Sequence, residues 1–382
     1  MLTPHTPEAL AESLAKAAAG KQTISLCGKS TKRKMAGPVE PSDVSISTKN
    51  LTRVLQYEPQ DLTVSVEAGV TYCVLSRLLA ENRQMIPLDP PFADNATIGG
   101  ILAANSSGPR RRLYGTARDL VIGMKFATLE GKLIQSGGMV VKNVAGLDMG
   151  KLMIGSFGTL AAIAVANFKV LPMPEVERTF LMSFDDLAAA IAARNRLLAG
   201  VLQPAAIDLL NPSAAGEYGG GRYLLAMQAT GNEAAIRRYE SEVSSMAAWA
   251  SLEGAAQETF WTHVRDFTPR FLATNRDGAV VRVSCTLKEL ARVLESIDAP
   301  VVARAGTGVL YACFSHFQLA ETWTAEAAGR GLHAVIEFAP EAQKSKLNLW
   351  PSPGNDLELM KRVKQMFDPN RLLNCGRLYR HI

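Results

Sequence analysis

The sequence has 382 residues, of which 47% are hydrophobic and 20% charged, a globular composition that excludes a disordered or fibrous chain. At roughly 150 residues per domain, this length predicts two domains, with three as the alternative. The formal net charge is 41 − 36 = +5, and the longest basic runs, at residues 32–34 and 110–112, are interpreted as solvated loops, so we expect no nucleic-acid partner.

Cysteine usage and apolar runs bear on the compartment. The five cysteines are widely spaced and form no C-x-x-C pair, so we expect no metal site and no iron–sulfur cluster bound by this chain alone. Sparse cysteines suit a reducing compartment. The first residues lack the features of a secretory signal, and the longest uncharged run, between Lys151 and Lys169, is too short and polar to span a membrane. We expect a cytoplasmic protein, with peripheral attachment to the inner membrane through partners as an open alternative.

The first part of the chain alternates helical and strand-like segments. Thr6, Pro7 and Glu8 predict the start of a helix, and Gly20 predicts its end. Strands are predicted at residues 23–27, 44–47 and 62–66. A helix is predicted at residues 71–83, with an apolar stripe of Val74, Leu75, Leu78 and Leu79. This alternation indicates α/β units.

Glycine is dense between residues 90 and 170, where strands are predicted at residues 121–126, 132–134 and 161–170. Such density indicates many turns, or backbone that approaches another group closely. Beyond Pro174, a helix at residues 184–199 and then alternating strand-like and helical runs predict a second, α+β domain. We therefore expect domains at residues 1–173 and 174–349 and a tail at residues 350–382, and we find no internal repeat.

The run Gly28-Lys29-Ser30-Thr31-Lys32 follows a predicted strand and resembles the end of a phosphate-binding loop. The Walker A motif needs a glycine at position 23, where Thr23 stands, and no G-x-G-x-x-G follows a strand and opens a helix. The remaining turn offers backbone N–H groups, hydroxyls and a cation, which suits a phosphate. An ordinary surface turn is the alternative.

A second phosphate-loop candidate lies at residues 97–108. Thr97 can cap a short helix whose first residues include Gly99 and Gly100, and exposed N–H groups at the helix start would then face an anion. The glycines remove side chains that would block this approach. The run Asn-Ser-Ser-Gly follows at residues 105–108, which an ordinary loop with two glycines less often supplies.

Several motifs together resemble those of a known family. The two candidate loops, with the glycine-containing runs at residues 115–123, 138–148 and 155–160, resemble the FAD-binding domain of the vanillyl-alcohol-oxidase/PCMH flavoprotein superfamily. The stretch Lys-Asn-Val-Ala-Gly-Leu-Asp at residues 142–148 narrows the resemblance to the FAD-binding subunits of bacterial glycolate oxidases. Residues 367–378 are similar to the ending Phe-Asp-Pro…Asn-Pro-Gly-Arg of this family. The likeness is strong over residues 20–175 and 360–380.

The resemblance implies an α+β fold. A PCMH-type FAD-binding domain of two subdomains would be followed by a smaller, ferredoxin-like α+β cap domain, and the tail would return to the FAD domain. The two loops would hold the FAD pyrophosphate, the strand near Ile163 would lie against the adenine end, and the flavin ring would sit where the two domains meet. The implied cofactor-binding residues are Gly28, Lys29, Ser30, Thr31, Lys32, Thr97, Gly99, Gly100, Asn105, Ser106, Gly108, Gly158 and Ile163.

Departures from the family pattern refine these expectations. Leu147 stands where the family often has tyrosine, and Cys375 replaces the usual proline. Covalent flavin attachment in the superfamily uses a histidine in the first loop or a cysteine in the second, and this chain has lysine and serines there. We therefore predict non-covalent FAD. We also predict that Gly99→Val abolishes flavin binding, because a branched side chain would fill space meant for the pyrophosphate.

Oxidation of a 2-hydroxy acid needs a cation for the carboxylate, a base for the hydroxyl proton and flavin to accept the hydride. Arg304, just before a turn, and His316, at a predicted strand end, are the candidate catalytic residues. A structural role is the alternative for each of them.

The resemblance leaves two functions open. In the first, this chain is a subunit of a hetero-oligomeric glycolate (2-hydroxy acid) oxidase of glycolate catabolism, with a second FAD-linked oxidase subunit and an iron–sulfur subunit that accepts the electrons. In the second, it is an FAD-containing structural or electron-relay subunit without its own substrate oxidation. The absence of an H-x-G-D-G-N-x-H motif favours the second. A stand-alone reductase of the UDP-sugar type would explain neither residues 142–148 nor the tail.

Overall fold

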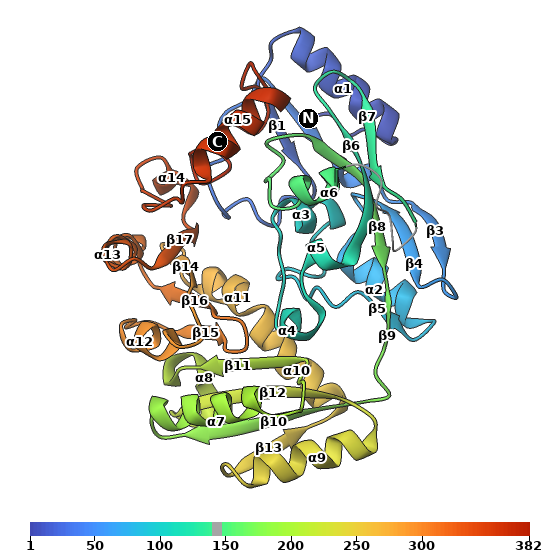
Figure 1. The fold of residues 1–382 in the computed structure, drawn as a ribbon. Helices are drawn as coiled ribbons and strands as arrows, with labels where there is room; N and C mark the ends of the chain where they lie inside the picture. The colour runs from blue at the N-terminus through green and yellow to red at the C-terminus, as the bar shows by residue number, and fades with distance from the viewer. Residues whose placement is uncertain (140–146) are drawn as a thin grey trace. The chain divides into compact units, whose positions relative to one another are not determined.

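The computed structural model describes residues 1–139 and 147–382, which form two compact units (Figure 1). The first unit comprises Met1–Ser107, Gly115–Met173 and Pro353–Ile382, and the second comprises Gly108–Tyr114 and Pro174–Ser352. The expected continuous range 1–173 does not anticipate that residues 108–114 belong to the second unit. The motif at residues 142–146 lies outside the described residues.

The first unit contains a five-stranded sheet, two strand pairs and several helices. Its elements are α1 (Pro7–Ala19), β1 (Ile24–Cys27), β2 (Val44–Ser47), η1 (Thr48–Asn50), β3 (Val54–Glu58), β4 (Thr63–Glu67), α2 (Tyr72–Ala80), β5 (Gln84–Met85), α3 (Ile98–Ala103), α5 (Ala117–Leu120), β6 (Val121–Ala127), β7 (Leu133–Gly137), α6 (Met149–Met153), β8 (Ala162–Lys169), β9 (Leu171–Pro172) and α15 (Leu357–Phe367).

The five-stranded sheet is antiparallel, in the order β3-β4-β8-β6-β7. Helix α1 packs on this sheet through Leu10, Leu14 and Ala17, whose spacing of four and three residues places them on one helix face. The predicted cap of α1 is confirmed, since Thr6 Oγ1 accepts a hydrogen bond from the Ala9 N–H at 3.1 Å. A second core contains residues of α2, α3 and the sheet.

Strand β1 is paired on both sides. It runs parallel to β2, with Ile24 opposite Val44. On its other side, the Ile24 N–H donates to the Leu372 carbonyl at 2.7 Å, and the Asn374 N–H donates to the Ile24 carbonyl at 2.9 Å. Residues 353–382, which we call the returning segment, therefore complete a sheet that begins near the start of the chain.

The second unit is built around one eight-stranded sheet. Its elements are α4 (Arg111–Tyr114), β10 (Val176–Phe184), α7 (Leu187–Ala199), β11 (Ala206–Leu210), α8 (Pro212–Gly219), β12 (Tyr223–Gly231), α9 (Glu233–Ser244), β13 (Trp249–Leu252), α10 (Gly254–Arg265), α11 (Phe267–Thr274), β14 (Ala279–Ser284), α12 (Leu290–Glu295), β15 (Val301–Arg304), β16 (Val309–Phe314), α13 (Phe317–Gly329), β17 (His333–Phe338) and α14 (Glu341–Lys344).

The strand order of this sheet reveals a repeated topology. The first four strands lie in the order β13-β10-β12-β11, and the last four in the order β17-β14-β16-β15 when read from the opposite edge. The second half has a helix after its first and third strands, which is the β-α-β-β-α-β order of a ferredoxin-like unit. The first half has the same order with one addition, helix α8 between its second and third strands. The halves join where β11 pairs with β15. The expected ferredoxin-like cap is therefore present twice, and the expectation of no internal repeat is wrong at the level of topology.

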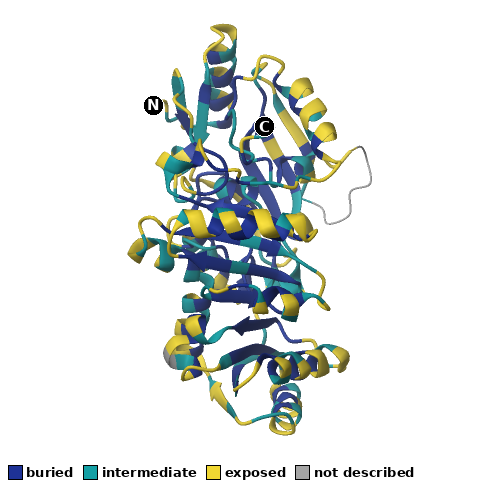
Figure 2. Ribbon diagram, turned by 90° about the vertical axis from the view of Figure 1, so that its left-hand side faces the viewer, coloured by how far each residue is buried: buried dark blue, intermediate teal, exposed yellow. Residues whose placement is uncertain are grey.

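Most predicted elements of both units are present, with shifted ends. One detail of the predicted apolar stripe is wrong, because Val74 in α2 is 55% exposed. Figure 2 shows that the central strands are mostly buried, whereas the helices alternate buried and exposed residues. Among the described residues, we find no helix with the length and apolar character needed to cross a membrane.

Candidate cofactor site

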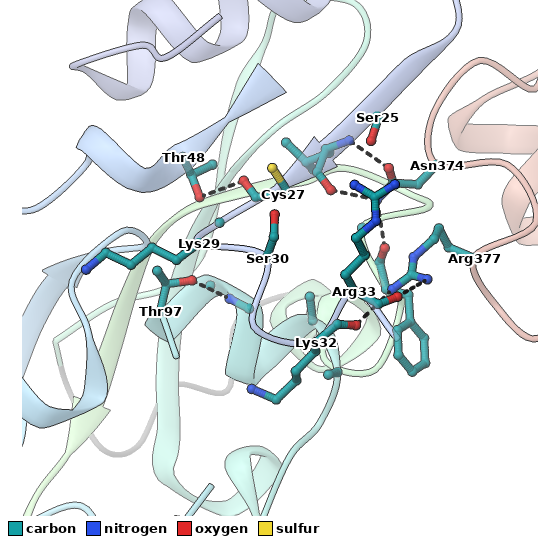
Figure 3. A pocket seen from close by; sticks show the side chains of 18 of the residues that line it. Ser25, Cys27, Lys29, Ser30, Lys32, Arg33, Thr48, Thr97, Asn374 and Arg377 are labelled. Carbon is teal, nitrogen blue, oxygen red and sulfur yellow. Dashed lines mark hydrogen bonds between the residues drawn. The ribbon is translucent and has the colours of Figure 1, made fainter. Parts of the chain in front are cut away.

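A cavity of about 240 Å³ lies in the first unit (Figure 3). Its walls come from β1 and the loop after it, from Thr97 and α3, from residues near Phe157 and Ile163, and from the returning segment. The predicted cofactor-binding residues in this lining are Gly28, Lys29, Ser30, Thr31, Lys32, Thr97, Gly99, Gly100, Gly158 and Ile163. The fold therefore brings together the two loops that the sequence places about 70 residues apart.

The first loop presents unused backbone donors. Within the described part of the chain, the N–H groups of Lys29, Ser30 and Thr31 have no protein acceptor. Ser30 has a left-handed backbone conformation, with φ of 58°. Turns in which successive N–H groups converge in this way form concave sites for anions. This loop fits the phosphate-binding interpretation better than that of an ordinary surface turn.

The N–H groups at the helix start of the second loop bond to the protein rather than to an anion. Thr97 caps α3 as predicted, since its Oγ1 accepts from the Gly100 N–H at 3.3 Å. The Ile98 N–H donates to the Val70 carbonyl and the Gly99 N–H to the Ala68 carbonyl, each at 2.8 Å. The prediction that exposed N–H groups of this helix start face an anion is therefore wrong.

Glycine at position 28 is required by contact between the loops. A Cβ built on Gly28 would overlap the Oγ1 atom of Thr97. A Cβ on Gly99 would lie 2.8 Å from the Cβ of Ala68, which no real Cβ contact allows. All three glycines line the cavity, but Gly28 and Gly99 also permit close packing of the protein on itself, whereas a Cβ on Gly100 would meet Thr97 Oγ1 at 3.1 Å.

The charged side chains in the described lining of the cavity are all positive. Its lining contains four cations, Lys29, Lys32, Arg33 and Arg377, and none of its described lining residues is Asp or Glu. The Lys32 ammonium also lies 5.9 Å from the centre of the Phe92 ring. Several cations beside unused N–H groups favour a ligand with more than one negative charge, such as a pyrophosphate. Apolar lining residues, among them Leu26, Val39, Ala161 and Ile163, suit an attached uncharged ring.

Three predicted cofactor residues, Asn105, Ser106 and Gly108, do not line this cavity. Within the described residues, Asn105 Oδ1 and Ser106 Oγ are nevertheless buried polar atoms without a hydrogen-bond partner. Buried unsatisfied atoms are uncommon in folded proteins, but these two lie outside the lining, and an atom of Arg194 in the second unit is in the same state. Gly108 belongs to the second unit. The cavity is also smaller than the roughly 300–1,000 Å³ typical of pockets that enclose a drug-sized ligand, so it accommodates part of an FAD molecule.

Asn374 and Arg377 are among the lining residues that the sequence does not predict. The Asn374 side chain accepts from the Leu26 N–H at 2.7 Å and donates to the carbonyls of Leu26 and Phe157 at 3.2 and 2.9 Å. The Arg377 guanidinium donates to the carbonyls of Lys32 and Arg33 at the end of the first loop (Figure 3), and to the carbonyl of Gly37 beyond it. The similarity of residues 367–378 to a family ending is the only signal in the sequence that pointed to this segment.

The two predicted catalytic residues do not form one site. Both belong to the second unit, where Arg304 lies opposite Val309 at the start of strand β16 and His316 follows the end of that strand. His316 lies seven residues beyond Val309, and seven residues of extended chain span roughly 20 Å. Arg304 is buried and paired with the fully buried Asp208, whereas His316 is exposed at the start of α13. The fold of the second unit therefore does not bring these two side chains together, and Arg304 already has a carboxylate partner.

Cysteine reactivity offers a test of the cavity. Cys27 lines it, whereas Cys73 on α2 does not. Burial raises the pKa of the Cys285 thiol to about 11, and burial also raises the pKa of Cys313. With iodoacetamide at pH 8, we expect Cys285 and Cys313 to react slowly because the thiolate is the nucleophile. Cys27 should react in the apoprotein and be protected by FAD, while Cys73 is not protected. Peptide mass spectrometry measures the alkylation rate of each cysteine with and without FAD. Equal protection of Cys27 and Cys73 would contradict FAD binding in this cavity.

The chain matches two protein families. Residues 1–137 match the FAD binding domain family, and residues 173–351 and 351–378 match the C-terminal domain of FAD linked oxidases. The acid-free cationic cavity and the unused N–H groups of residues 29–31 fit FAD. Fold and cavity thus define a flavoprotein whose cofactor is FAD. The chain belongs to the FAD-linked oxidases, which confirms the expected superfamily and its α+β fold.

Individual relatives agree with this assignment. The chain is 33% identical over 163 residues to the glycolate oxidase subunit GlcD of Bacillus subtilis (strain 168), covering 43% of this chain and 35% of that one. It is 33% identical over 168 residues to the glycolate oxidase subunit GlcE of Escherichia coli (strain K12), covering 44% and 47%. These matches span less than half the length of either relative. The fold is similar to that of an alkyldihydroxyacetonephosphate synthase, with a TM-score of 0.72, 18% identity, and coverage of 97% of this chain and 75% of that one.

Within the described residues, no cluster of three or more His, Cys, Asp or Glu side chains is suited to hold a metal ion.

Proposed function

We propose that this chain is the FAD-binding subunit of an oxidoreductase complex that oxidises a small 2-hydroxy acid, with glycolate as the first candidate. The observation that carries the proposal is the cationic cavity, which is free of acidic lining residues and is built by a chain that belongs to the FAD-linked oxidases. The two relatives named as glycolate oxidase subunits supply the substrate class. We further propose an iron–sulfur subunit and a second FAD-linked subunit as partners, in the cytoplasm or at the inner membrane through them.

FAD and the residues of the first unit have separate roles in this proposed function. Bound FAD supplies the hydride acceptor. The residues of the first unit would bind and orient the cofactor: the N–H groups of residues 29–31 and the ammonium groups of Lys29 and Lys32 would receive its phosphates, and Arg377 would hold the loop that carries them. Orientation of this kind needs no titrating side chain in the cavity, and the described lining offers no carboxylate or imidazole as a base. The base and the carboxylate-binding cation must come from elsewhere.

A relay function is the second candidate, and two observations favour it. The two side chains that the sequence offers for substrate chemistry are separated by the β15–β16 hairpin, and Arg304 is engaged with Asp208. The sequence also lacks the H-x-G-D-G-N-x-H motif. In this alternative, the chain would hold FAD as an electron carrier between a sister flavoprotein and the iron–sulfur partner, with no substrate oxidation of its own.

An anaerobic spectrum of the purified chain separates the two functions. The protein is loaded with FAD, and glycolate is added to the same cuvette. Bleaching of the flavin absorption would establish that this chain oxidises the substrate. A flavin that stays oxidised, but bleaches when the sister subunit is added, would establish the relay. A protein that binds no FAD would overturn both.

We predict that FAD is bound without a covalent bond. The cavity lining contains one cysteine, Cys27, in strand β1, and no histidine among the described residues. Denaturation with acid should therefore release all flavin into the supernatant, measured by its fluorescence after precipitation of the protein. Flavin that remains with the precipitated chain would contradict this prediction.

A further inference from the structure

The returning segment joins the first unit at the wall of the cavity. The backbone groups of residues 372 and 374 form hydrogen bonds with the backbone of Ile24, on the edge of β1 that faces away from β2. Helix α15, which precedes them, packs partly on the core of the same unit through Val363 and Phe367. The position of β1, from which the first loop starts, thus depends on residues near the other end of the sequence.

The Asn374 side chain bridges two walls of the cavity. It pairs with both backbone groups of Leu26 in β1, and its remaining donor bonds the Phe157 carbonyl at 2.9 Å. Phe157 and Gly158 both have left-handed backbone, with φ of 52° and 68°, and both line the cavity. A Cβ on Gly158 would lie 2.9 Å from Asn374 Nδ2, so the glycine gives the amide room to approach. Asn374 therefore fixes the spacing between β1 and the turn at residues 157–158.

Arg377 holds the first loop through its carbonyl groups. The guanidinium donates to the carbonyl of Gly37 and, at 3.5 Å, to those of Lys32 and Arg33, while the Gly37 N–H donates to the Arg377 carbonyl at 2.9 Å. The planar fork of arginine suits several acceptors at once. This clamp acts on the part of the loop that follows the unused N–H groups of residues 29–31.

A buried ion pair fixes the turn that presents these two residues. Lys364 Nζ donates to Asp368 Oδ2 at 2.6 Å and to the carbonyls of Thr159 and Leu373 at 2.8 Å each. The carboxylate of Asp368 accepts the N–H groups of Leu372 and Leu373. Each of the three donor positions of the ammonium is used, so the turn at residues 368–373 has a defined shape.

We propose that Asn374 and Arg377 are positioning residues of the FAD site, and that retention of FAD depends on the returning segment as much as on the two loops. They act by holding β1, the first loop and the turn at residues 157–158 in the geometry that receives the phosphates. The inference rests on FAD as the occupant of the cavity. It goes beyond the proposed function because it assigns a role in cofactor binding to residues outside both phosphate loops.

The test uses the full chain and the variants Asn374→Ala and Arg377→Ala. The matched control is Arg371→Ala, because Arg371 is an exposed arginine of the same segment that does not line the cavity. FAD affinity is measured by the quenching of flavin fluorescence on titration with apoprotein. Hydrogen exchange of residues 24–37 is followed in the apoproteins by mass spectrometry. We expect affinity to fall at least tenfold in both variants, with faster exchange in the first loop, and the control to match the wild type.

The outcomes separate this inference from the proposed function. Wild-type protein that does not bind FAD would overturn the occupant and the inference together. Wild-type binding with unchanged affinity and exchange in both variants would overturn the inference alone. If Asn374→Ala fails to fold, Arg377→Ala decides, because its side chain is partly exposed at the surface. Arg377→Lys should restore only part of the affinity, since an ammonium lacks the fork that reaches three carbonyls.

Discussion

Replacing Lys364 by methionine is expected to lower the free energy of unfolding by about 3–5 kcal/mol, because it leaves the Asp368 carboxylate buried without its cation. The pair is 2.6 Å apart, with the two side chains 7% and 0% exposed. The substitution also removes donors from the carbonyls of Thr159 and Leu373. Urea denaturation followed by circular dichroism measures the loss.

The matched control is Lys361→Met on the same helix. Lys361 is paired with Glu358 at 2.7 Å, but both side chains are largely exposed, so this pair contributes little. A second variant, Lys364→Met with Asp368→Leu, removes both charges and should recover part of the stability lost in the single variant. Equal effects of Lys364→Met and Lys361→Met would contradict the buried pair.

Gly99→Val is expected to lose FAD and to destabilise the first unit by about 1–3 kcal/mol or more, as overpacking does. The reason differs from the one that the sequence suggests. A side chain at this position meets Ala68 rather than the phosphate space, with its Cβ 2.8 Å from the Ala68 Cβ and 3.2 Å from the Ala68 carbonyl. Helix α3 would have to move away from the end of β4 and break the bond from the Gly99 N–H to Ala68.

Thermal melting and FAD titration together distinguish the two reasons. The control is Gly329→Val, because a Cβ on Gly329 at the end of α13 has open space around it. The packing explanation requires that Gly99→Val lowers both the melting temperature of the apoprotein and the FAD affinity. Loss of FAD with unchanged melting would restore direct obstruction of the pyrophosphate. Unchanged FAD binding would refute both explanations.

The parts of the site that depend on neighbouring residues could be predicted from the sequence. The cap at Thr97 needs only the Gly100 N–H three residues later, and the turn at residues 28–32 carries its own glycine, hydroxyls and lysines. Both lie in the lining of the cavity. The sequence does not predict which carbonyl groups accept hydrogen bonds from the first N–H groups of α3, because the acceptors, Ala68 and Val70, lie about 30 residues away.

The parts that depend on distant residues could not be predicted from local patterns. Asn374 and Leu26 are 348 residues apart, and no periodicity connects them. The interpretation of residues 32–34 as a solvated loop is incomplete for the same reason, since Lys32 and Arg33 line the cavity. The distance between Arg304 and His316 could not be predicted either, because it follows from the register of two antiparallel strands.

The double pairing of β1 has a consequence for how the protein is made. A chain grows from its N-terminus at roughly 5–20 residues per second, and its N-terminal parts begin to fold first. The partner of β1 on one side, β2, emerges about 20 residues after it, whereas Asn374 emerges 348 residues after Leu26. The whole eight-stranded unit is translated in between. The cofactor site therefore closes only after translation of the second unit, and a nascent chain that stops short of residue 374 carries both phosphate loops without the clamp that shapes them.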